Sequence, residues 1–568
     1  MEKRGALRGV GLNNFSRYIT GLGKSSAEMA TSVSKLRNIP RRLSSIAREW
    51  KYLTQVTTTS LHRARRIRKA LRNEPPLQMQ VPKRAIINSG TSWLPLEIEL
   101  YFAWLLAAAG CRVEVMLDDG MLAHWEAAQV HNLRHYSPYQ APRIVRRAHR
   151  VGKVLAGYAY RHPNIRIIPY SAVVPASAVT EESPGWHRSF AESSVKRFFQ
   201  DGDPEGSLEK EHYYGLCLRN CRISEAVGRY AVEQAKADLF ITSHGIYSLW
   251  GPAYRVAADS GTPTAVWQTA GTQKGALRIV DVHDGILVRS SAWQTFRRQA
   301  PFCPEILDEG KTILDSRINL TALDTNEYFA GLHRNGNTQI PLSIPCDATT
   351  FGMFPNVVWD GDIAERNIMF SSVVEWCVFT INEFRRLPHH LIIRFHPSEA
   401  TRLKGSRPLE SVVRQHIPDL DMLPNVHLIK AEYPVNSYAL AREFVDIGLI
   451  YDGHLCVELA HMGIPVIACT QGNFTDDAFT RKPSSPEQYQ DWLASPEEAV
   501  QWFESCRDHA QSMAHAFAYW EYRDSVDFYK PLVQPFPPRM DYDSLPAGSP
   551  MGSDGARIVR RILGITGV

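Results

Sequence analysis

The chain has 568 residues, of which 44% are hydrophobic and 22% charged, and its formal net charge is +5. A chain of this length exceeds one hydrophobic core, so it is expected to fold into two or three domains of an ordinary globular class. Its nine cysteines are odd in number and irregularly spaced, which argues against a disulfide framework or a structural metal site and favours a reducing compartment.

The basic charge is concentrated at the amino terminus. Residues 1–75 hold 17 Lys/Arg against 4 Asp/Glu, so the remaining chain is net acidic. Residues 1–80 are therefore predicted to form a basic, helical arm, which is either solvated or able to contact an anionic membrane surface. The arm has few aromatic residues between its basic ones and no recognisable nucleic-acid-binding module, so no nucleic acid partner is expected.

The sequence favours a cytoplasmic protein that is peripheral on the inner face of the cell membrane if the arm binds lipid. No apolar run is long enough for a transmembrane helix, because the best candidate, residues 101–117, is interrupted by Gly110, Arg112 and Glu114. The first residues lack the apolar core of a signal peptide.

Residues 81–345 are predicted to form the first domain. Short apolar runs that each end in a polar cluster are predicted to be strands, and one clear helix pattern lies between two of them. This is the sequence pattern of β-α-β units in a parallel sheet. Residues 122–222 are interpreted as helices and an inserted segment within this domain. The expected elements are strands at 84–88, 112–117, 237–242 and 264–267 and a helix at 96–109.

Residues 346–530 show the same β-α-β sequence pattern and are predicted to form a second domain. Residues 531–568 are predicted to form a Pro-rich connecting segment and a final helix at 556–563 that packs back onto the domains. The fold class is therefore α/β, with two Rossmann-like parallel sheets facing a cleft. The elements expected in the second domain are strands at 354–360, 391–395, 426–429, 446–451 and 464–468 and helices at 367–387, 437–443 and 486–515.

Polar residues follow the strands of the second domain at the edge where open α/β sheets bind ligands. Arg-Phe-His-Pro-Ser-Glu occupies residues 394–399, and Tyr-Asp-Gly-His occupies residues 451–454. Cationic side chains and helix amino termini can neutralise a phosphate there without a metal. Structural alternatives remain open, since Arg394 could instead pair with Glu399 and residues 452–453 could form an ordinary turn.

The order of these motifs resembles the bacterial capsule polysaccharide biosynthesis family, which includes Kdo transferases, and more broadly the GT-B glycosyltransferases. The resemblance spans residues 237–489 and is strongest over 356–466, where Asn-x-x-Trp-Asp, Arg-x-His-Pro-x-Glu, Ser-Tyr and Gly-Ile-Pro-Val occur in order. One departure is the turn at residues 451–456, where a carboxylate and an imidazole replace the family's hydroxyl-rich turn.

The resemblance implies a metal-independent GT-B glycosyltransferase of capsule-type polysaccharide biosynthesis. It would move a sugar from a nucleotide-sugar donor, CMP- or UDP-linked, to a polysaccharide or lipid-linked acceptor, with no cofactor and no metal. The implied donor-binding residues are Arg394, His396, Glu399, Ser437, Tyr438, Asp452, Gly453, His454 and Glu458. Candidates for the catalytic base are His244, Asp119 and Glu97, and further cleft residues are Tyr247, Lys274 and Asp360.

Two other function classes stay open at this stage. A nucleotide-sugar epimerase or a glycerol-phosphate polymer transferase reuses the same paired-domain fold, and fold alone does not separate them. The altered turn at residues 451–456 is also compatible with a degenerate transferase that serves as a membrane-associated scaffold or glycan-binding subunit.

Overall fold

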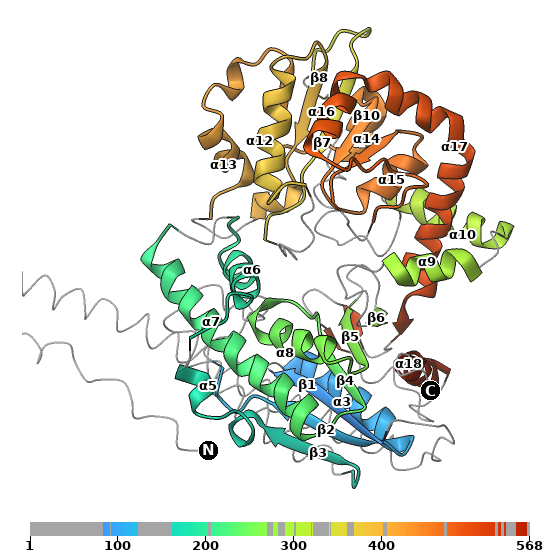
Figure 1. The fold of residues 1–568 in the computed structure, drawn as a ribbon. Helices are drawn as coiled ribbons and strands as arrows, with labels where there is room; N and C mark the ends of the chain where they lie inside the picture. The colour runs from blue at the N-terminus through green and yellow to red at the C-terminus, as the bar shows by residue number, and fades with distance from the viewer. Residues whose placement is uncertain are drawn as a thin grey trace, which may run out of the picture. The chain divides into compact units, whose positions relative to one another are not determined.

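The computed structural model describes two large β-sheets, each covered by helices, within one compact unit, Ser60–Val568 (Figure 1). The structure describes the following residues, with gaps between them: 83–90, 93–122, 162–180, 182–202, 206–269, 276–281, 290–299, 303–319, 321, 340, 342–359, 369–401, 406–470, 474–528, 532–534, 539–540 and 553–564.

The first sheet has seven strands in the order β12-β6-β5-β4-β1-β2-β3. Strands β1 to β5 run parallel, whereas β6 and β12 add antiparallel at one edge. The strands are β1 (Arg84–Gly90), β2 (Arg112–Leu117), β3 (Ile165–Pro169), β4 (Leu239–Ser243), β5 (Thr264–Thr269), β6 (Ala276–Asp281) and β12 (Asp527–Phe528).

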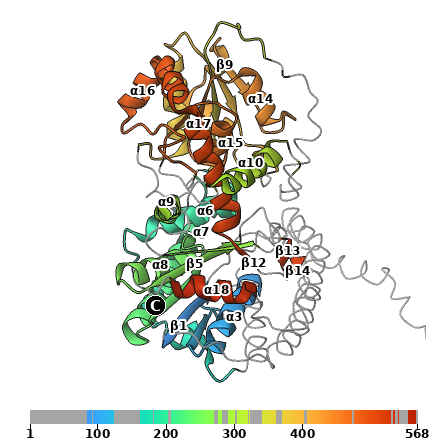
Figure 2. The same ribbon diagram turned by 90° about the vertical axis from the view of Figure 1, so that its right-hand side faces the viewer.

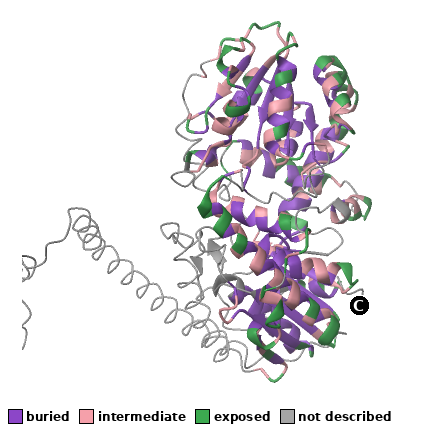
Figure 3. Ribbon diagram, turned by 60° about the vertical axis from the view of Figure 1, so that its left-hand side comes forward, coloured by how far each residue is buried: buried purple, intermediate pink, exposed green. Residues whose placement is uncertain are grey.

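Apolar side chains from both faces of the first sheet are buried (Figure 3). Ala85 and Ile87 of β1 point to a core shared with α3 (Trp93–Ala108) and α18 (Ser553–Gly564), whereas Ile86 points to the opposite core. Successive strand residues alternate between faces, so a parallel sheet covered on both sides reads as a continuous apolar run. Figure 2 shows α18 beside α3.

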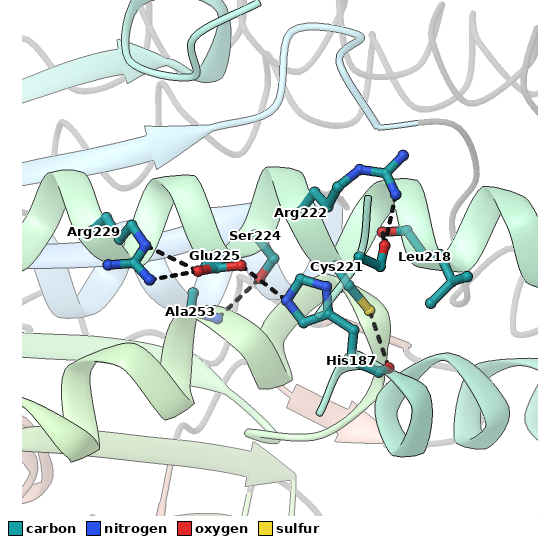
Figure 4. Close-up of polar contacts among 9 residues, drawn as sticks. His187, Leu218, Cys221, Arg222, Ser224, Glu225, Arg229 and Ala253 are labelled. Atoms are coloured by element: carbon teal, nitrogen blue, oxygen red, sulfur yellow. Dashed lines mark hydrogen bonds and ion pairs between the residues drawn. The ribbon is translucent and has the colours of Figure 1, made fainter. Parts of the chain in front are cut away.

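The second face is covered by α7 (Leu208–Arg229) and α8 (Tyr247–Asp259), with α6 (His187–Phe199) packed against both. Pro252 lies inside α8 and supplies no N–H to the helix. The hydroxyl of Ser224 on α7 accepts from the N–H of Ala253 at 3.2 Å (Figure 4). The same hydroxyl donates to the carbonyl oxygen of Leu249 at 2.9 Å. The α7 side chain therefore satisfies backbone groups on either side of the proline.

A contact between a buried histidine and a carboxylate joins α6 to α7. The ring of His187 is fully buried and its Nε2 lies 3.0 Å from Oε2 of Glu225 (Figure 4). Arg229 donates to the other carboxylate oxygen from Nε at 2.9 Å and from Nη2 at 2.7 Å. The hydrogen bond with His187, together with Arg229, lowers the pKa of Glu225. The carboxylate thus fixes the packing of the two helices.

The second sheet has five parallel strands in the order β11-β10-β7-β8-β9. Phe351 and Met353 of β7 join the core under α12, α13 and α16, whereas Phe354 joins the opposite core with α14 and α15. The strands are β7 (Thr350–Phe354), β8 (His390–Arg394), β9 (Val426–Ile429), β10 (Ile447–Ile450) and β11 (Val466–Ala468); the helices are α12 (Val373–Phe384), α13 (Leu409–His416), α14 (Ser437–Phe444), α15 (Leu455–His461), α16 (Pro486–Ala494) and α17 (Pro496–Tyr519).

Two helices that precede the second sheet in the chain pack with it. Helix α10 (Pro304–Ile318) contacts α15 and α17, and Trp293 of α9 (Ser290–Gln299) shares a core with Phe517 of α17. After α17, the π-turn η10 (Trp520–Asp524) leads into β12 of the first sheet. Residues 290–318, placed by the sequence in the first domain, therefore pack with the second sheet, and residues 527–528 belong to the first.

The remaining described elements are short or peripheral. They are α5 (Ser177–Thr180), the two-stranded pair β13 (Leu532–Gln534) and β14 (Arg539–Met540), the 3-10 turns η5 (Tyr170–Ala172), η8 (Pro397–Thr401) and η9 (Leu420–Met422), and the π-turn η6 (Tyr230–Gln234). No helix in the described part of the chain is long and apolar enough to cross a membrane.

The predicted α/β class is confirmed, and most predicted strands occur within two residues of their expected positions. The strand predicted at 354–360 is wrong, because β7 ends at Phe354 and Pro355 cannot donate to a sheet ladder. The single helix predicted at 486–515 is also wrong, since Pro496 begins a separate helix, α17. Strands β3, β6, β12, β13 and β14 were missed.

Candidate functional site

Each sheet has one topological switch point, where the chain reverses its direction of travel across the sheet. In the second sheet β8 and β9 add on one side of β7, and β10 then returns to the other side. In the first sheet β4 returns beside β1 in the same way. Loops at a switch point leave on opposite faces of the sheet, and ligands of open α/β proteins bind outside the strand ends there.

The switch point of the second sheet is formed by the turn that follows β10. Gly453 has φ +145°, a conformation that favours glycine, and an added Cβ would meet no atom within 4 Å. Tyr451 is buried and its hydroxyl donates to the carbonyl oxygen of Phe370 at 3.1 Å. Asp452 and His454 flank the glycine. The turn is thus anchored at one end and has open space over its glycine backbone.

His454 is held by aromatic side chains from other segments. Its Nδ1 lies 2.9 Å from the hydroxyl oxygen of Tyr522 in η10, and its ring centroid lies 3.9 Å from that of Phe474. Because both ring neighbours are bulky, the imidazole has a defined orientation at the start of α15.

Glu458, one turn further along α15, is only 3% exposed. Its Oε1 lies 2.7 Å from Nε of Arg317, which comes from the last turn of α10. Tyr438 hydrogen-bonds with Glu458, and burial followed by this carboxylate raises the pKa of Tyr438 well above its ordinary value. Glu458, one of the implied donor-binding residues, is therefore already paired, so a bound donor would share its carboxylate with Arg317.

Arg394 and Glu399 occupy structural positions, and the ion pair considered between them is replaced by other contacts. The Arg394 guanidinium donates to the carbonyl oxygens of Lys430, Tyr433 and Val435, and burial lowers its pKa to about 10. The Glu399 carboxylate accepts from the N–H of Leu409, the first residue of α13. We therefore interpret Arg394 and Glu399 as supports of the loops after β8.

His396 and the start of α14 complete this edge of the second sheet. The N–H of Ser398 donates to Nδ1 of His396 at 3.1 Å, which fixes the ring after β8. The cap of α14 is Asn436, whose side chain accepts from the N–H groups of Tyr438 and Ala439. Ser437 and Tyr438, two of the implied donor-binding residues, are thus the first two residues of α14.

The switch point of the first sheet holds a strained turn after β4. His244 has φ +54° and Tyr247 has φ +66°, and both conformations are uncommon for residues other than glycine. Nδ1 of His244 lies 2.5 Å from the hydroxyl of Ser243, and its ring stacks on Trp250. Strained backbone of this kind persists where surrounding contacts fix it, and it is frequent at functional sites.

Beside this turn the structure buries a carboxyl group that sequence reasoning missed. Glu99 of α3 is fully buried, and its Oε1 accepts from Nε1 of Trp267 at 3.1 Å. Burial raises the pKa of Glu99 to about 8 despite hydrogen bonds with Ser89 and Trp267. The available signal was a carboxylate within an almost wholly apolar helix.

The other predicted base candidates are placed differently. Asp119 accepts from the N–H of Ser171 at 3.0 Å and from its hydroxyl at 2.5 Å, so it ties the exit of β2 to that of β3. Glu97 lies on α3, but its side chain falls outside the described residues, as do Lys274 and Asp360. Within the described segments, no group of three or more His, Cys, Asp and Glu side chains could hold a metal ion.

Comparison with known proteins gives structural matches of low similarity. No protein-family model and no curated protein sequence matches the chain. The KpsC β-Kdo 2,4 transferase of Thermosulfurimonas dismutans matches with 11% identity and a TM-score of 0.34 over 57% of this chain and 87% of that one. UDP-GlcNAc 2-epimerase from Neisseria meningitidis, bound to UDP-GlcNAc, matches with 11% identity and a TM-score of 0.24 over 78% of this chain and 99% of that one.

A third match is the wall teichoic acid polymerase TagF, with 10% identity and a TM-score of 0.22 over 87% of this chain and 98% of that one. The matches thus include the transferase class that the sequence motifs resemble and the epimerase class that was kept open as an alternative on the same fold. TM-scores of this size do not indicate a function. Any functional assignment therefore depends on the residues of the chain itself.

Proposed function

We propose that the chain is a GT-B type glycosyltransferase that moves a sugar from a nucleotide-activated donor to a surface polysaccharide or glycolipid precursor. One observation carries the proposal: each of the two large sheets has a histidine turn at its topological switch point, His244 in the first and His454 in the second. Transfer between two substrates requires two binding sites, and the switch point is where such sheets bind ligands.

The second sheet is the proposed donor side. The backbone at Gly453 is open to the approach of a phosphate, and His454 and His396 can donate hydrogen bonds that stabilise a leaving nucleotide. Charge stabilisation by such preorganised donors needs no metal. The donor is proposed to be a CMP- or UDP-linked sugar.

The first sheet is the proposed acceptor side. His244 stands in the strained turn with its Nδ1 beside the Ser243 hydroxyl. In the tautomer in which Nδ1–H donates to that hydroxyl, Nε2 can receive a proton from an acceptor hydroxyl. General base catalysis needs such a group within hydrogen-bond reach of the reacting proton. Asp119 and Glu97 remain rival candidates in the proposal.

The proposed acceptor is linked to lipid or to a growing polysaccharide at the inner face of the cell membrane. The excess of 17 Lys/Arg over 4 Asp/Glu in residues 1–75 supports this location. Each cation near an anionic leaflet contributes on the order of 1 kcal/mol of attraction.

The first test is a thermal-shift panel with CMP, CDP, UDP, GDP and their sugar conjugates. Binding at a hundredfold excess over the dissociation constant stabilises a protein by about 2.7 kcal/mol. We expect a base-specific shift that is lost in His454→Ala and His396→Ala. His416→Ala is the matched control, because His416 is exposed at the end of α13.

The second test incubates the nucleotide-sugar that gives the largest shift with the protein and a lipid-linked glycan extract. Sugar incorporation into the extract with release of free nucleotide supports the transferase. Interconversion of the sugar without transfer identifies an epimerase instead. Absence of a shift with every nucleotide contradicts the proposal and favours a scaffold or glycan-binding subunit.

A further inference from the structure

Tyr522 contacts the proposed donor side from a segment that the sequence did not connect with it. Its hydroxyl lies 2.9 Å from Nδ1 of His454, and the two rings are nearly parallel at 26° with centroids 5.9 Å apart. Tyr522 belongs to η10, which lies between α17 and β12. The residue therefore comes from the crossing that returns the chain to the first sheet.

The position of Tyr522 is fixed on several sides. The side chain is only 7% exposed, and the guanidinium carbon of Arg317 lies 5.1 Å from its ring centroid. Arg317 is in turn held by Glu458 at 2.7 Å. Contact between a cation and an aromatic face is attractive and strengthens when both are withdrawn from water. The tyrosine ring thus has little freedom to rotate away from His454.

The neighbouring residue in η10 anchors the same turn to the first sheet. Glu521 forms a buried ion pair with Arg278 of β6 at 2.8 Å, and Arg278 also donates to the Glu521 carbonyl oxygen at 2.7 Å. Neither side chain exceeds 6% exposure. A turn held on both sides can place a hydroxyl within a narrow range.

The Tyr522 hydroxyl keeps its proton at neutral pH. Burial raises the pKa of this phenol above its ordinary value, and Arg317 only partly opposes that effect. A neutral imidazole has one donor nitrogen and one acceptor nitrogen, and the partner of one nitrogen sets the tautomer. A phenol that donates to Nδ1 leaves the ring proton on Nε2.

We propose that Tyr522 is a positioning residue that holds neutral His454 in its Nε2–H tautomer, so that His454 presents an N–H donor to a phosphate of the nucleotide-sugar. This inference rests on the proposed function for the identity of the phosphate. The contact between Tyr522 and His454 is independent of it.

The test is nitrogen NMR of the imidazoles in full-length protein labelled at histidine, at a pH where His454 is neutral. The chain has 20 histidines, so a His454→Gln sample assigns the resonance. Tyr522→Phe removes the hydroxyl and keeps the ring against Arg317. Tyr519→Phe, on the preceding turn, is the matched control. Pyrophosphate is titrated as the probe for the phosphate of the nucleotide-sugar.

We expect wild type and Tyr519→Phe to show one predominant tautomer with the proton on Nε2. Tyr522→Phe should show a mixture, and its apparent affinity for pyrophosphate should fall about tenfold. An unchanged tautomer in Tyr522→Phe overturns the inference. A tautomer change without a pyrophosphate response in any sample supports the positioning by Tyr522 and counts against the donor role of His454 in the proposed function.

Discussion

Nε of Arg317 lies 2.7 Å from Oε1 of Glu458, and the two side chains are 13% and 3% exposed. The pair joins the end of α10 to α15, directly after the turn that carries His454. A charge buried to this degree is stable only while its partner remains, because the desolvation cost of each ion is offset by the other.

Arg317→Met should destabilise the protein by about 3–5 kcal/mol, because it leaves the Glu458 carboxylate buried without a counter-charge. Chemical denaturation measures the free energy of unfolding. Arg523→Met is the control, since Arg523 of η10 and Glu309 of α10 form an exposed pair, and its cost should be about 1 kcal/mol or less. The double variant Arg317→Met/Glu458→Gln should recover part of the loss; equal losses in the single and double variants would contradict this account.

The buried Glu99 should make stability depend on pH. Its pKa rises from 4.5 to about 8 on folding, so between these values the folded state binds more protons than the unfolded state. The stability associated with this group is therefore fully present below pH 4.5 and is lost as the pH rises through 8. At 1.36 kcal/mol per pH unit the loss amounts to at most roughly 5 kcal/mol.

Glu99→Gln should remove this dependence and still accept from Nε1 of Trp267. Unfolding measured at pH 5 and pH 8 should differ less in Glu99→Gln than in wild type. The exposed Glu209→Gln should retain the wild-type slope. An identical slope in wild type and Glu99→Gln would show that Glu99 does not titrate in this range.

Two helical glycines should respond to alanine with opposite signs. A Cβ at Gly310 of α10 would overlap the carbonyl oxygen of His515 on α17, and backbone cannot move aside cheaply. A Cβ at Gly215 of α7 would meet no atom within 4 Å. Gly310→Ala should therefore cost about 1–3 kcal/mol or more, whereas Gly215→Ala should stabilise by about 0.5–1 kcal/mol. Thermal unfolding of the two variants, side by side, checks the difference.

Ser224→Ala should destabilise the packing of α7 on α8 by about 1–3 kcal/mol, because the carbonyl of Leu249 and the N–H of Ala253 each lose a buried partner near Pro252. Ser316→Ala is the comparison. Among the described residues, that hydroxyl bonds only to a carbonyl of its own helix, at Ile313, and its removal should be nearly neutral. Similar losses in both variants would rule out a special role for Ser224.

The sequence by itself determined the α/β class and most strands, because face alternation and Gly/Pro punctuation act over a few neighbouring residues. It also determined that polar residues follow β4, β8 and β10, since a strand ends where its apolar run ends. Positions such as His244 and His454 were therefore predictable as strand exits.

Tertiary structure alone decided the partners of those residues. Glu458 meets an arginine 141 positions earlier, and His454 meets a tyrosine 68 positions later. Strand β12 joins the first sheet after the chain has completed the second. Such pairings depend on how whole helices and sheets pack, since burial and charge neutralisation are properties of the assembled core and leave no local pattern in the chain.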